Sequence, residues 1–221
     1  MLDDLIAIRH EVFRCTRRCD GVACEPERGL RPRGPLIEQR DPASIGALVV
    51  GLNPGGSDEL EREVLRRPTH ATEWESWVHG RTERSVYLER LRRFVDAVGV
   101  RGSIIWSNVA KCECTPGRRG LPLLTQRDCA HRFLVRELTA VPKEWIAVAA
   151  GLDAYKALAF LSLNRVVLGI PHPTGANPAF SRLWSKDKTL RPWIQHAVQS
   201  LLVNGQSSAA WLPDIERAAP P

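Results

Sequence analysis

The chain has 221 residues, with 31 lysine and arginine residues against 25 aspartate and glutamate residues, so its formal net charge is +6. Its apolar share of 43% is ample for a real core, and the basic excess favours an anionic partner, nucleic acid first. No stretch reaches the roughly 20 apolar residues that span a bilayer, and the start of the chain lacks the basic-then-apolar order of a signal peptide. We therefore expect a cytoplasmic protein without a membrane partner. Its six cysteines then favour metal, cluster or catalytic roles over disulfides.

Residues 2–15 have the apolar spacing of an amphipathic helix that ends at Cys15, and a connection rich in Pro, Arg and Gly follows. Four short, nearly continuous apolar runs come next, of the kind that forms strands covered on both faces of a parallel sheet. These runs are residues 47–52, 103–109, 144–151 and 165–170.

Helical patterns accompany these runs at 85–99, 126–140, 152–162 and 191–203, and Gly99 is a natural C-cap for the first of them. The alternation predicts an α/β fold: a three-layer α/β/α sandwich around a central, mainly parallel four-stranded sheet with right-handed crossovers. We expect a single domain over residues 1–221, with the N-terminal segment 1–45 packed on the core. The tail over 206–221 is expected to fray, apart from Trp211, which docks.

Ligands of open α/β sheets lie beyond the carboxyl ends of the strands. Here the first, second and fourth runs lead into GLNPGGS (51–57), SNVAKCECTPGRR (107–119) and GIPHPTGAN (169–177). In this order the segments resemble the uracil-DNA glycosylase superfamily, because GLNPG is similar to its first motif and HPTGAN to its second. The layout of SNVAKC, TPGRR, DCAHRFLVREL and AAGLDAYKAL is similar to the iron–sulfur-containing family 4 branch, from about Cys15 to Ser181. Asn53 stands where that branch has an acidic residue, as in the mismatch-specific and single-strand-selective branches.

The resemblance implies a DNA glycosylase, which flips a nucleotide out of the duplex and hydrolyses its N-glycosidic bond to leave an abasic site. Asn53 would orient the attacking water, and His172 would donate a hydrogen bond to the pyrimidine O2 as negative charge develops there. Asn108 would read the Watson–Crick edge of the flipped base. The other residues expected at the base are Gly51, Leu52, Gly55 and Trp77, the last chosen over Trp74 for stacking.

Further residues are expected to contact DNA, which is the one partner that we predict. The basic ones face phosphates, Thr174 contacts a phosphate beside the lesion, and Asn177 or Phe180 enters the gap left by the flipped nucleotide. The full set is Gly56, Ser57, Lys111, Arg118, Arg119, Thr174, Asn177 and Phe180. We infer no obligate protein partner, so a monomer is expected. The loop TPGRRGLPLL lacks the histidine with which one branch bonds covalently to DNA, and no lysine is placed like a Schiff-base nucleophile, so the enzyme is expected to be monofunctional.

The identity of the base has two interpretations. Some branches place an aromatic residue against pyrimidine C5 at the fifth position of the first motif, and here that position is Gly55. The amide of Asn108 can match either uracil or cytosine. The substrates are therefore uracil, as in DNA repair, or a modified pyrimidine such as the C5-modified cytosine of phage DNA, as in antiviral defence. The alternative from another class is a non-catalytic, metal-stabilised nucleic-acid-binding protein of the same fold.

Four thiolates can hold a [4Fe–4S] cluster even when they come from distant segments. The resemblance implies Cys112, after the second run, and Cys129, at the start of the following helix, as two ligands. The C-x3-C pair Cys15 and Cys19 completes the predicted set. The bound group would pin the N-terminal helix to the sheet, so its role would be structural.

Two alternatives concern the ligands, and one concerns the occupant. Cys24 competes with Cys19, and Cys114 would replace Cys112 if the turn TPG, rather than NVAK, sets the register. Structural zinc is the alternative occupant, because four thiolates in tetrahedral array suit it equally.

Overall fold

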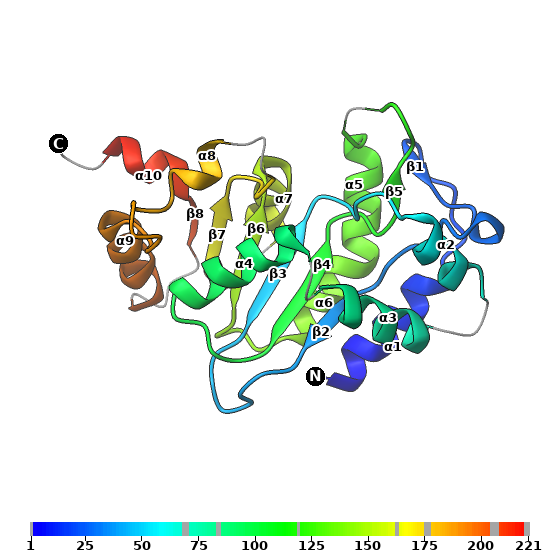
Figure 1. Cartoon of the computed structure of the whole chain (residues 1–221), viewed down its shortest axis with the longest axis horizontal. Coiled ribbons are helices and arrows are strands. Elements are labelled where there is room, and N and C mark those ends of the chain that lie inside the picture. Colours follow the sequence, from blue (N-terminus) through cyan, green and yellow to red (C-terminus); the bar gives the residue numbers. More distant parts are fainter. Residues whose placement is uncertain are drawn as a thin grey trace.

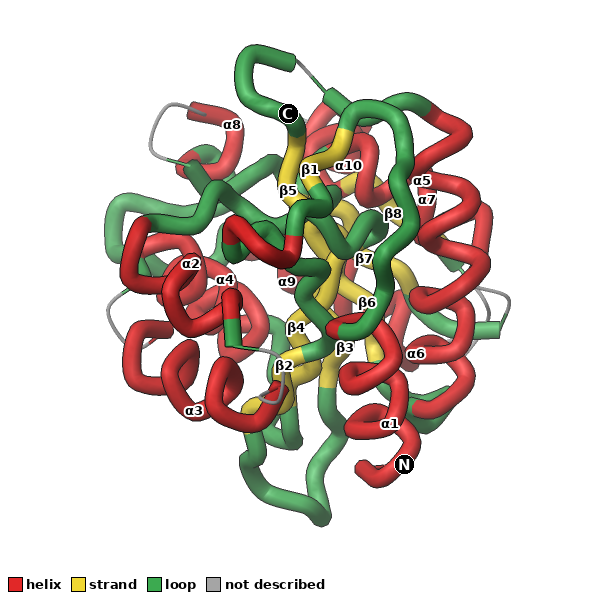
Figure 2. The backbone as a smooth tube through the Cα atoms, turned by 90° about the vertical axis from the view of Figure 1, so that its right-hand side faces the viewer, coloured by secondary structure: helices red, strands yellow, loops and turns green. Residues whose placement is uncertain are grey.

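A six-stranded sheet runs through the middle of the molecule and carries helices on both faces (Figures 1 and 2). The computed structural model describes residues 2–67, 71–82, 85–118, 120–161, 164–174, 178–203 and 208–218, so the predictions for Arg119 and Asn177 lie outside the described residues. The strand β2 is antiparallel to its neighbour β4, and all other neighbours are parallel. In spatial order the strands are β2 (Leu36–Glu38), β4 (Ile104–Asn108), β3 (Ala47–Gly51), β6 (Ile146–Ala150), β7 (Val167–Ile170) and β8 (Ala209–Trp211).

The helices form the two outer layers, with α2, α3 and α4 on one side of the sheet and α1, α5, α6 and α7 on the other (Figure 2). A single π-helical turn, η2, joins α5 to α6. In chain order the helices are α1 (Leu2–Phe13), the short 3-10 helix η1 (Pro26–Arg28), α2 (Glu59–Arg66), α3 (Ala71–Thr82), α4 (Val86–Ala97), α5 (Leu123–Cys129), η2 (Ala130–Leu134), α6 (Val135–Ala140), α7 (Leu152–Leu161), α8 (Pro178–Ser181), α9 (Pro192–Val203) and α10 (Leu212–Ala218).

The apolar runs form strands because each of their two faces is covered by a separate core. Ala47 and Val49 of β3 pack with α4 and α9, whereas Leu48 and Val50 pack with α1, α6 and α7 on the other face. Successive side chains of a strand point to opposite faces, so a strand covered on both sides is apolar throughout. The four predicted central strands and the mainly parallel sandwich are thereby confirmed, as is the left-handed Gly99, at φ +92°, that ends α4.

Two edge strands were missed, so the prediction of four strands is wrong. The segments β2 and β8 have three residues each, too few to carry a recognisable apolar pattern. The frayed tail is corrected by the same finding, because residues 209–211 pair with β7 and residues 212–218 form α10. Trp211 does dock, with its ring centroid 5.4 Å from that of Tyr155.

A small second sheet joins the N-terminal segment to the loop after β4. Strand β1 (Val22–Ala23) pairs antiparallel with β5 (Glu113–Cys114), and this pairing lies beyond the main sheet (Figure 1). It brings the chain around Cys24 beside the chain around Cys112. Within the described residues, no helix combines the length and the apolarity that crossing a membrane requires.

Candidate functional site

The carboxyl ends of β3, β4 and β7 meet at one edge of the sheet, and each leads into a predicted site residue. The segments that follow β3 and β4 continue the pairing of these two strands: Val109 N donates to Gly51 O and Ala110 N donates to Leu52 O, both at 2.9 Å. Strand β7 is separated from β3 by β6 alone, so these ends lie about 10 Å apart. Asn53, Asn108 and His172 are therefore gathered at the same edge.

Asn108 ends β4 and is half-buried beside Gly51. With its amide nitrogen turned toward them, it donates to the main-chain oxygens of Ser107 and Asn53, each 3.2 Å away. A Cβ at Gly51 would lie 2.7 Å from this amide, closer than side-chain atoms approach, so any other residue there would displace the Asn108 side chain. In this orientation the amide oxygen of Asn108 is directed away from those carbonyls and toward hydrogen-bond donors.

Asn53 lies two residues beyond the end of β3, with its side chain half-buried. Its amide nitrogen donates to Pro54 O at 2.8 Å, which fixes the plane of the amide. Among the described residues, the amide oxygen of Asn53 accepts no hydrogen bond, so it is free to position a water molecule.

His172 follows β7, and its ring packs beside Tyr87 of α4. The two ring centroids are 5.2 Å apart, and a Cβ at Gly151 would lie 3.7 Å from Cδ2 of the imidazole. His172 keeps an exposed surface, yet the atoms packed around its ring bury it enough to lower its pKa below the ordinary value. The ring is therefore neutral at pH 7 and carries one N–H donor.

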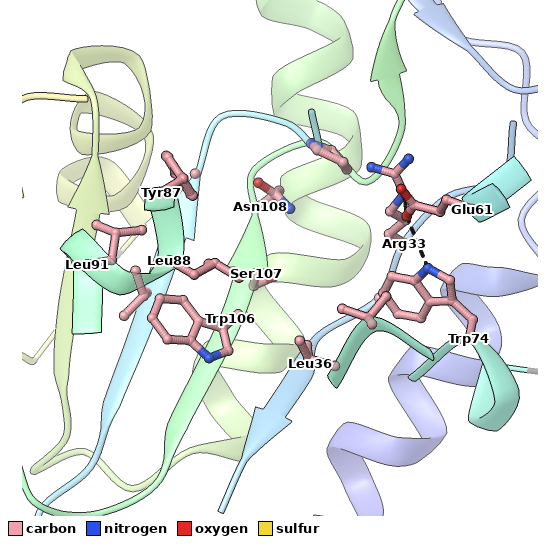
Figure 3. Close-up of a pocket in the computed structure, with 15 residues that line it drawn as sticks. Arg33, Leu36, Glu61, Trp74, Tyr87, Leu88, Leu91, Trp106, Ser107 and Asn108 are labelled. Atoms are coloured by element: carbon pink, nitrogen blue, oxygen red, sulfur yellow. Dashed lines mark hydrogen bonds and ion pairs between the residues drawn. The ribbon is translucent and has the colours of Figure 1, made fainter. Parts of the chain in front are cut away.

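A pocket of about 200 Å³ opens between α3 and α4 and over β4, and Asn108 lines it, whereas Asn53 and His172 do not (Figure 3). This is smaller than the roughly 300–1,000 Å³ of sites for drug-sized ligands, so it suits one base rather than a whole nucleotide. Figure 3 shows Tyr87, Leu88 and Leu91 on one side of the pocket and Trp74, Glu61 and Arg33 on the other. Its lining consists of Arg33, Gly34, Leu36, Val49, Gly51, Pro54, Glu61, Trp74, Val78, Tyr87, Leu88, Leu91, Trp106, Ser107 and Asn108.

A buried network of charges forms one wall of this pocket. Arg33 pairs with Glu61 at 3.0 Å and with Glu113, and it donates to Gly55 O at 2.7 Å. The indole of Trp74 donates to Glu61 at 3.2 Å. These contacts tie the loop after β3 to the N-terminal segment, so the wall is rigid. No pattern along the chain marks Arg33 or Glu61, because their pairing is created by the fold.

Three predictions for the base site need correction. Trp77, which was expected to stack on the base, is not among the residues that line the pocket. Trp74, the alternative that was not chosen, does line it. The side chain of Leu52 packs into the core on the opposite face of the sheet. Gly55 is exposed and is not among the lining residues either. As its lack of a side chain implies, it contributes no wall against pyrimidine C5, and a Cβ there would meet nothing within 4 Å. The bulky aromatic residues of the pocket are instead Trp74, Tyr87 and Trp106, and apolar patterning marks the last two as core.

Three of the predicted DNA contacts are also wrong, because the side chains are buried. Lys111 is fully buried, and its ammonium lies 2.8 Å from both carboxylate oxygens of Glu137. The hydroxyl of Ser57 accepts from Arg62 at 3.1 Å, and its main-chain N–H donates to Glu113 at 3.0 Å. Phe180 lies in the core with its ring near that of Trp184.

The other described candidates for DNA contact do lie at the surface. Gly56 and Thr174 are exposed, and so is Arg118. Arg118, however, forms a bidentate pair with Asp20 at 2.6 and 3.1 Å, which holds the pKa of that carboxyl below its ordinary value. Part of its positive charge is thus already compensated.

The thiols gather near the second sheet. The thiol of Cys112 hydrogen-bonds to Cys24, which lowers the pKa of Cys24 to about 7 and raises that of Cys112. The charges of Cys129 and Cys15 further raise the pKa of Cys112. Burial raises the pKa of Cys129 and of Cys19, the charge of Cys19 further raises that of Cys129, and the charges of Cys15 and Cys24 further raise that of Cys19. Five thiols from three separate segments thus lie near one another.

Cys114 stands outside this group of thiols. Burial raises the pKa of Cys114 and Arg118 lowers it, and no other thiol of the described residues contributes to this shift. The structure therefore places Cys112, rather than Cys114, toward the other thiols, and it adds Cys24 to them. Thiolate donors suit zinc or an iron–sulfur cluster, although no three His, Cys, Asp or Glu side chains of the described ranges are already arranged around a common ion.

Comparisons with protein-family models and with curated proteins gave no match for this chain.

Proposed function

We propose that this chain is a monofunctional DNA glycosylase of the uracil-DNA glycosylase type, which hydrolyses the N-glycosidic bond of uracil or of a C5-modified pyrimidine. The observation that carries the proposal is the convergence of Asn53, Asn108 and His172 at one edge of the sheet, beside a pocket of about 200 Å³. The sequence resemblance supports the same assignment. The basic net charge of +6 suits a DNA partner.

Each residue has a chemical task that its surroundings permit. The free amide oxygen of Asn53 holds a water beneath C1′, and the neutral imidazole of His172 donates to the pyrimidine O2, on which negative charge develops. The amide of Asn108 reads the edge of the base in the pocket. Tyr87 packs beside the imidazole of His172 and also lines the pocket, so the same side chain contacts the catalytic ring and the bound base.

An amide accepts no proton, so Asn53 acts by orienting the water rather than by deprotonating it. The developing oxocarbenium ion is itself a strong electrophile, and a positioned water suffices for attack on it. The base leaves as an anion that His172 stabilises, and the attacking water loses its proton to solvent only after it has bonded to C1′. Turnover is therefore slower than with a carboxylate at position 53.

The first experiment separates catalysis from binding and identifies the base. Duplexes that carry uracil, a thymine mismatch, or hydroxymethylated or glucosylated cytosine are incubated with the protein, and abasic sites are cleaved with alkali. We expect cleavage at uracil or at a modified cytosine and none on the unmodified duplex. Binding without any cleavage on the whole panel would contradict the proposed activity and favour the non-catalytic DNA-binding protein.

We also propose that four of the five gathered thiols hold a structural [4Fe–4S] cluster or zinc ion, with Cys15, Cys19, Cys112 and Cys129 as the first choice and Cys24 as the competitor of Cys19. Such a group would cross-link the end of α1, the loop after β4 and the end of α5. It would stabilise the fold because the ligands are gathered only in the folded chain, so the free energy of binding adds to that of folding.

Elemental analysis of anaerobically purified protein tests this site. We expect bound iron or zinc in the wild-type protein, its loss in Cys112→Ser and Cys129→Ser, and its retention in the control Cys114→Ser, whose thiol lies outside the group. Comparing Cys19→Ser with Cys24→Ser identifies the fourth ligand. A wild-type protein without either metal, or equal loss in the control, would rule the site out.

A further inference from the structure

A second, smaller hollow lies next to the loop that carries His172, and its polar lining is basic. It measures about 190 Å³ and contains two arginines of α4 and no acidic residue. We call it the arginine hollow; it is lined by Arg90, Arg93, Thr174, Pro178, Phe180, Ser181 and Trp184.

The charges of its two arginines are not compensated by carboxylates. Arg90 donates to the main-chain oxygen of Pro173 at 2.8 Å, and Arg93 donates to the main-chain oxygen of Lys188. In the part of the chain that the structure describes, neither guanidinium pairs with an acidic side chain. Arg92, between them in sequence, points elsewhere and pairs with Glu38 at 2.8 Å.

The two guanidiniums are also held in place. Arg93 is exposed but lies over the ring of Trp184, 4.3 Å from its centroid, and Arg90 is half-buried. A guanidinium that is stacked and bonded to a main-chain carbonyl has lost most of its freedom, yet it keeps N–H donors for a further acceptor. The hollow therefore offers preorganised donors and two positive charges to an anion.

The position of the hollow links it to the candidate site. Thr174 lies two residues after His172, and Arg90 bonds to the carbonyl of the residue between them. On the same face of α4, one turn earlier, Tyr87 packs against the His172 ring at 5.2 Å. An anion in the hollow would thus lie directly beside the nucleotide on which His172 acts.

We propose that the arginine hollow binds one backbone phosphate of the DNA strand, adjacent to the flipped nucleotide, through Arg90, Arg93 and the hydroxyl of Thr174. This inference rests on the proposed function, because it takes DNA as the ligand. A phosphate held by two fixed guanidiniums sets the register of the strand, so the flipped base enters the pocket while its C1′ faces Asn53.

The test is the salt dependence of binding to a duplex that carries a synthetic abasic-site analogue, which requires no reaction. We expect Arg90→Gln/Arg93→Gln to lower the slope of log K against log salt by about 0.9, the value for one lost phosphate contact. The variant Arg90→Lys/Arg93→Lys, which keeps both charges, retains most of the slope. The thermal unfolding midpoint of each variant verifies that it is folded.

Arg101→Gln is the matched control, because Arg101 also donates to main-chain oxygens, those of Asp96 and Val100, but lies at the opposite edge of the sheet, before β4. Its slope should equal that of the wild type. An unchanged slope in the double glutamine variant, or the same decrease in the control, overturns the phosphate site. A third outcome would also overturn the phosphate site. If millimolar inorganic phosphate weakens DNA binding while the variants leave the slope for DNA unchanged, the hollow binds a free anion rather than the DNA backbone.

The two proposals fail in different ways. If the wild-type protein releases a base while the double variant keeps the full slope, the phosphate site is wrong and the glycosylase stands. If the slope decreases as expected but no duplex of the panel yields an abasic site, the hollow is a DNA-backbone site and the catalytic proposal is wrong.

Discussion

Base release is expected to fall at least about 100-fold in Asn53→Ala and in His172→Ala, while DNA binding stays close to that of the wild type. Removing one preorganised donor to a developing negative charge costs about 10²–10³ in rate, and His172 is the donor nearest to the departing base in our proposal. Asn53→Ala loses the oxygen that positions the water. Single-turnover release of labelled base, measured with enzyme in excess, reports this step directly.

Both substitutions remove side chains that contribute little to the core. Among the described residues, the side chain of Asn53 bonds only to the neighbouring Pro54 O, and His172 packs against Tyr87 with its outer surface exposed. The loss therefore reflects chemistry rather than unfolding. His196→Ala, an exposed histidine of α9, serves as the control and should retain full activity. If neither Asn53→Ala nor His172→Ala slows release, the reactive centre lies elsewhere.

The central sheet could be predicted because its physics is local. Strands covered on both faces contain only apolar residues, as in β3 and β6, and a few residues are enough to show this. The candidate site followed for the same reason, since the carboxyl ends of parallel strands must meet. The edge strands β2 and β8 could not be predicted. Each has three residues and pairs with a single neighbouring strand, so it carries no comparable apolar pattern.

The errors at the site arise from partners that are distant in sequence. Lys111 follows a strand in a loop with arginines and was therefore expected to face phosphates, but Glu137, 26 residues later, draws it into the interior. Cys24 approaches Cys112 only because β1 pairs with β5. Both arrangements depend on tertiary contacts, for which spacing along the chain carries no signal.

The pair between Lys111 and Glu137 accounts for the second large effect that we expect. Both side chains are fully buried, and Ser107 donates to the same carboxylate at 2.5 Å while accepting from the ammonium at 2.7 Å. Lys111→Met leaves a buried carboxylate without its counter-charge. Breaking one partner of a buried ion pair costs about 3–5 kcal/mol, so the free energy of unfolding, measured in urea, should fall by that amount.

A comparison with a surface pair shows why burial decides the magnitude. Arg136 and Glu11 are 2.5 Å apart but each remains more than 40% exposed, so Arg136→Gln should change the free energy of unfolding by at most about 1 kcal/mol. In the buried pair, water cannot reach the remaining carboxylate to take the place of the lost ammonium. The free energy of unfolding therefore falls by the full desolvation cost of that charge. A loss in Lys111→Met as small as that in Arg136→Gln would contradict the burial of this pair.

The double variant Lys111→Met/Glu137→Leu separates stability from function. Removing both charges abolishes the uncompensated carboxylate, so most of the stability lost in Lys111→Met should return. The ammonium of Lys111 also donates to the main-chain oxygen of Asn108 at 2.8 Å, and the double variant cannot restore that bond. We therefore expect a stable protein that binds its base less selectively, because the end of β4 that presents the Asn108 amide is no longer held from behind. Wild-type discrimination between bases in the double variant would show that the buried pair serves the fold alone.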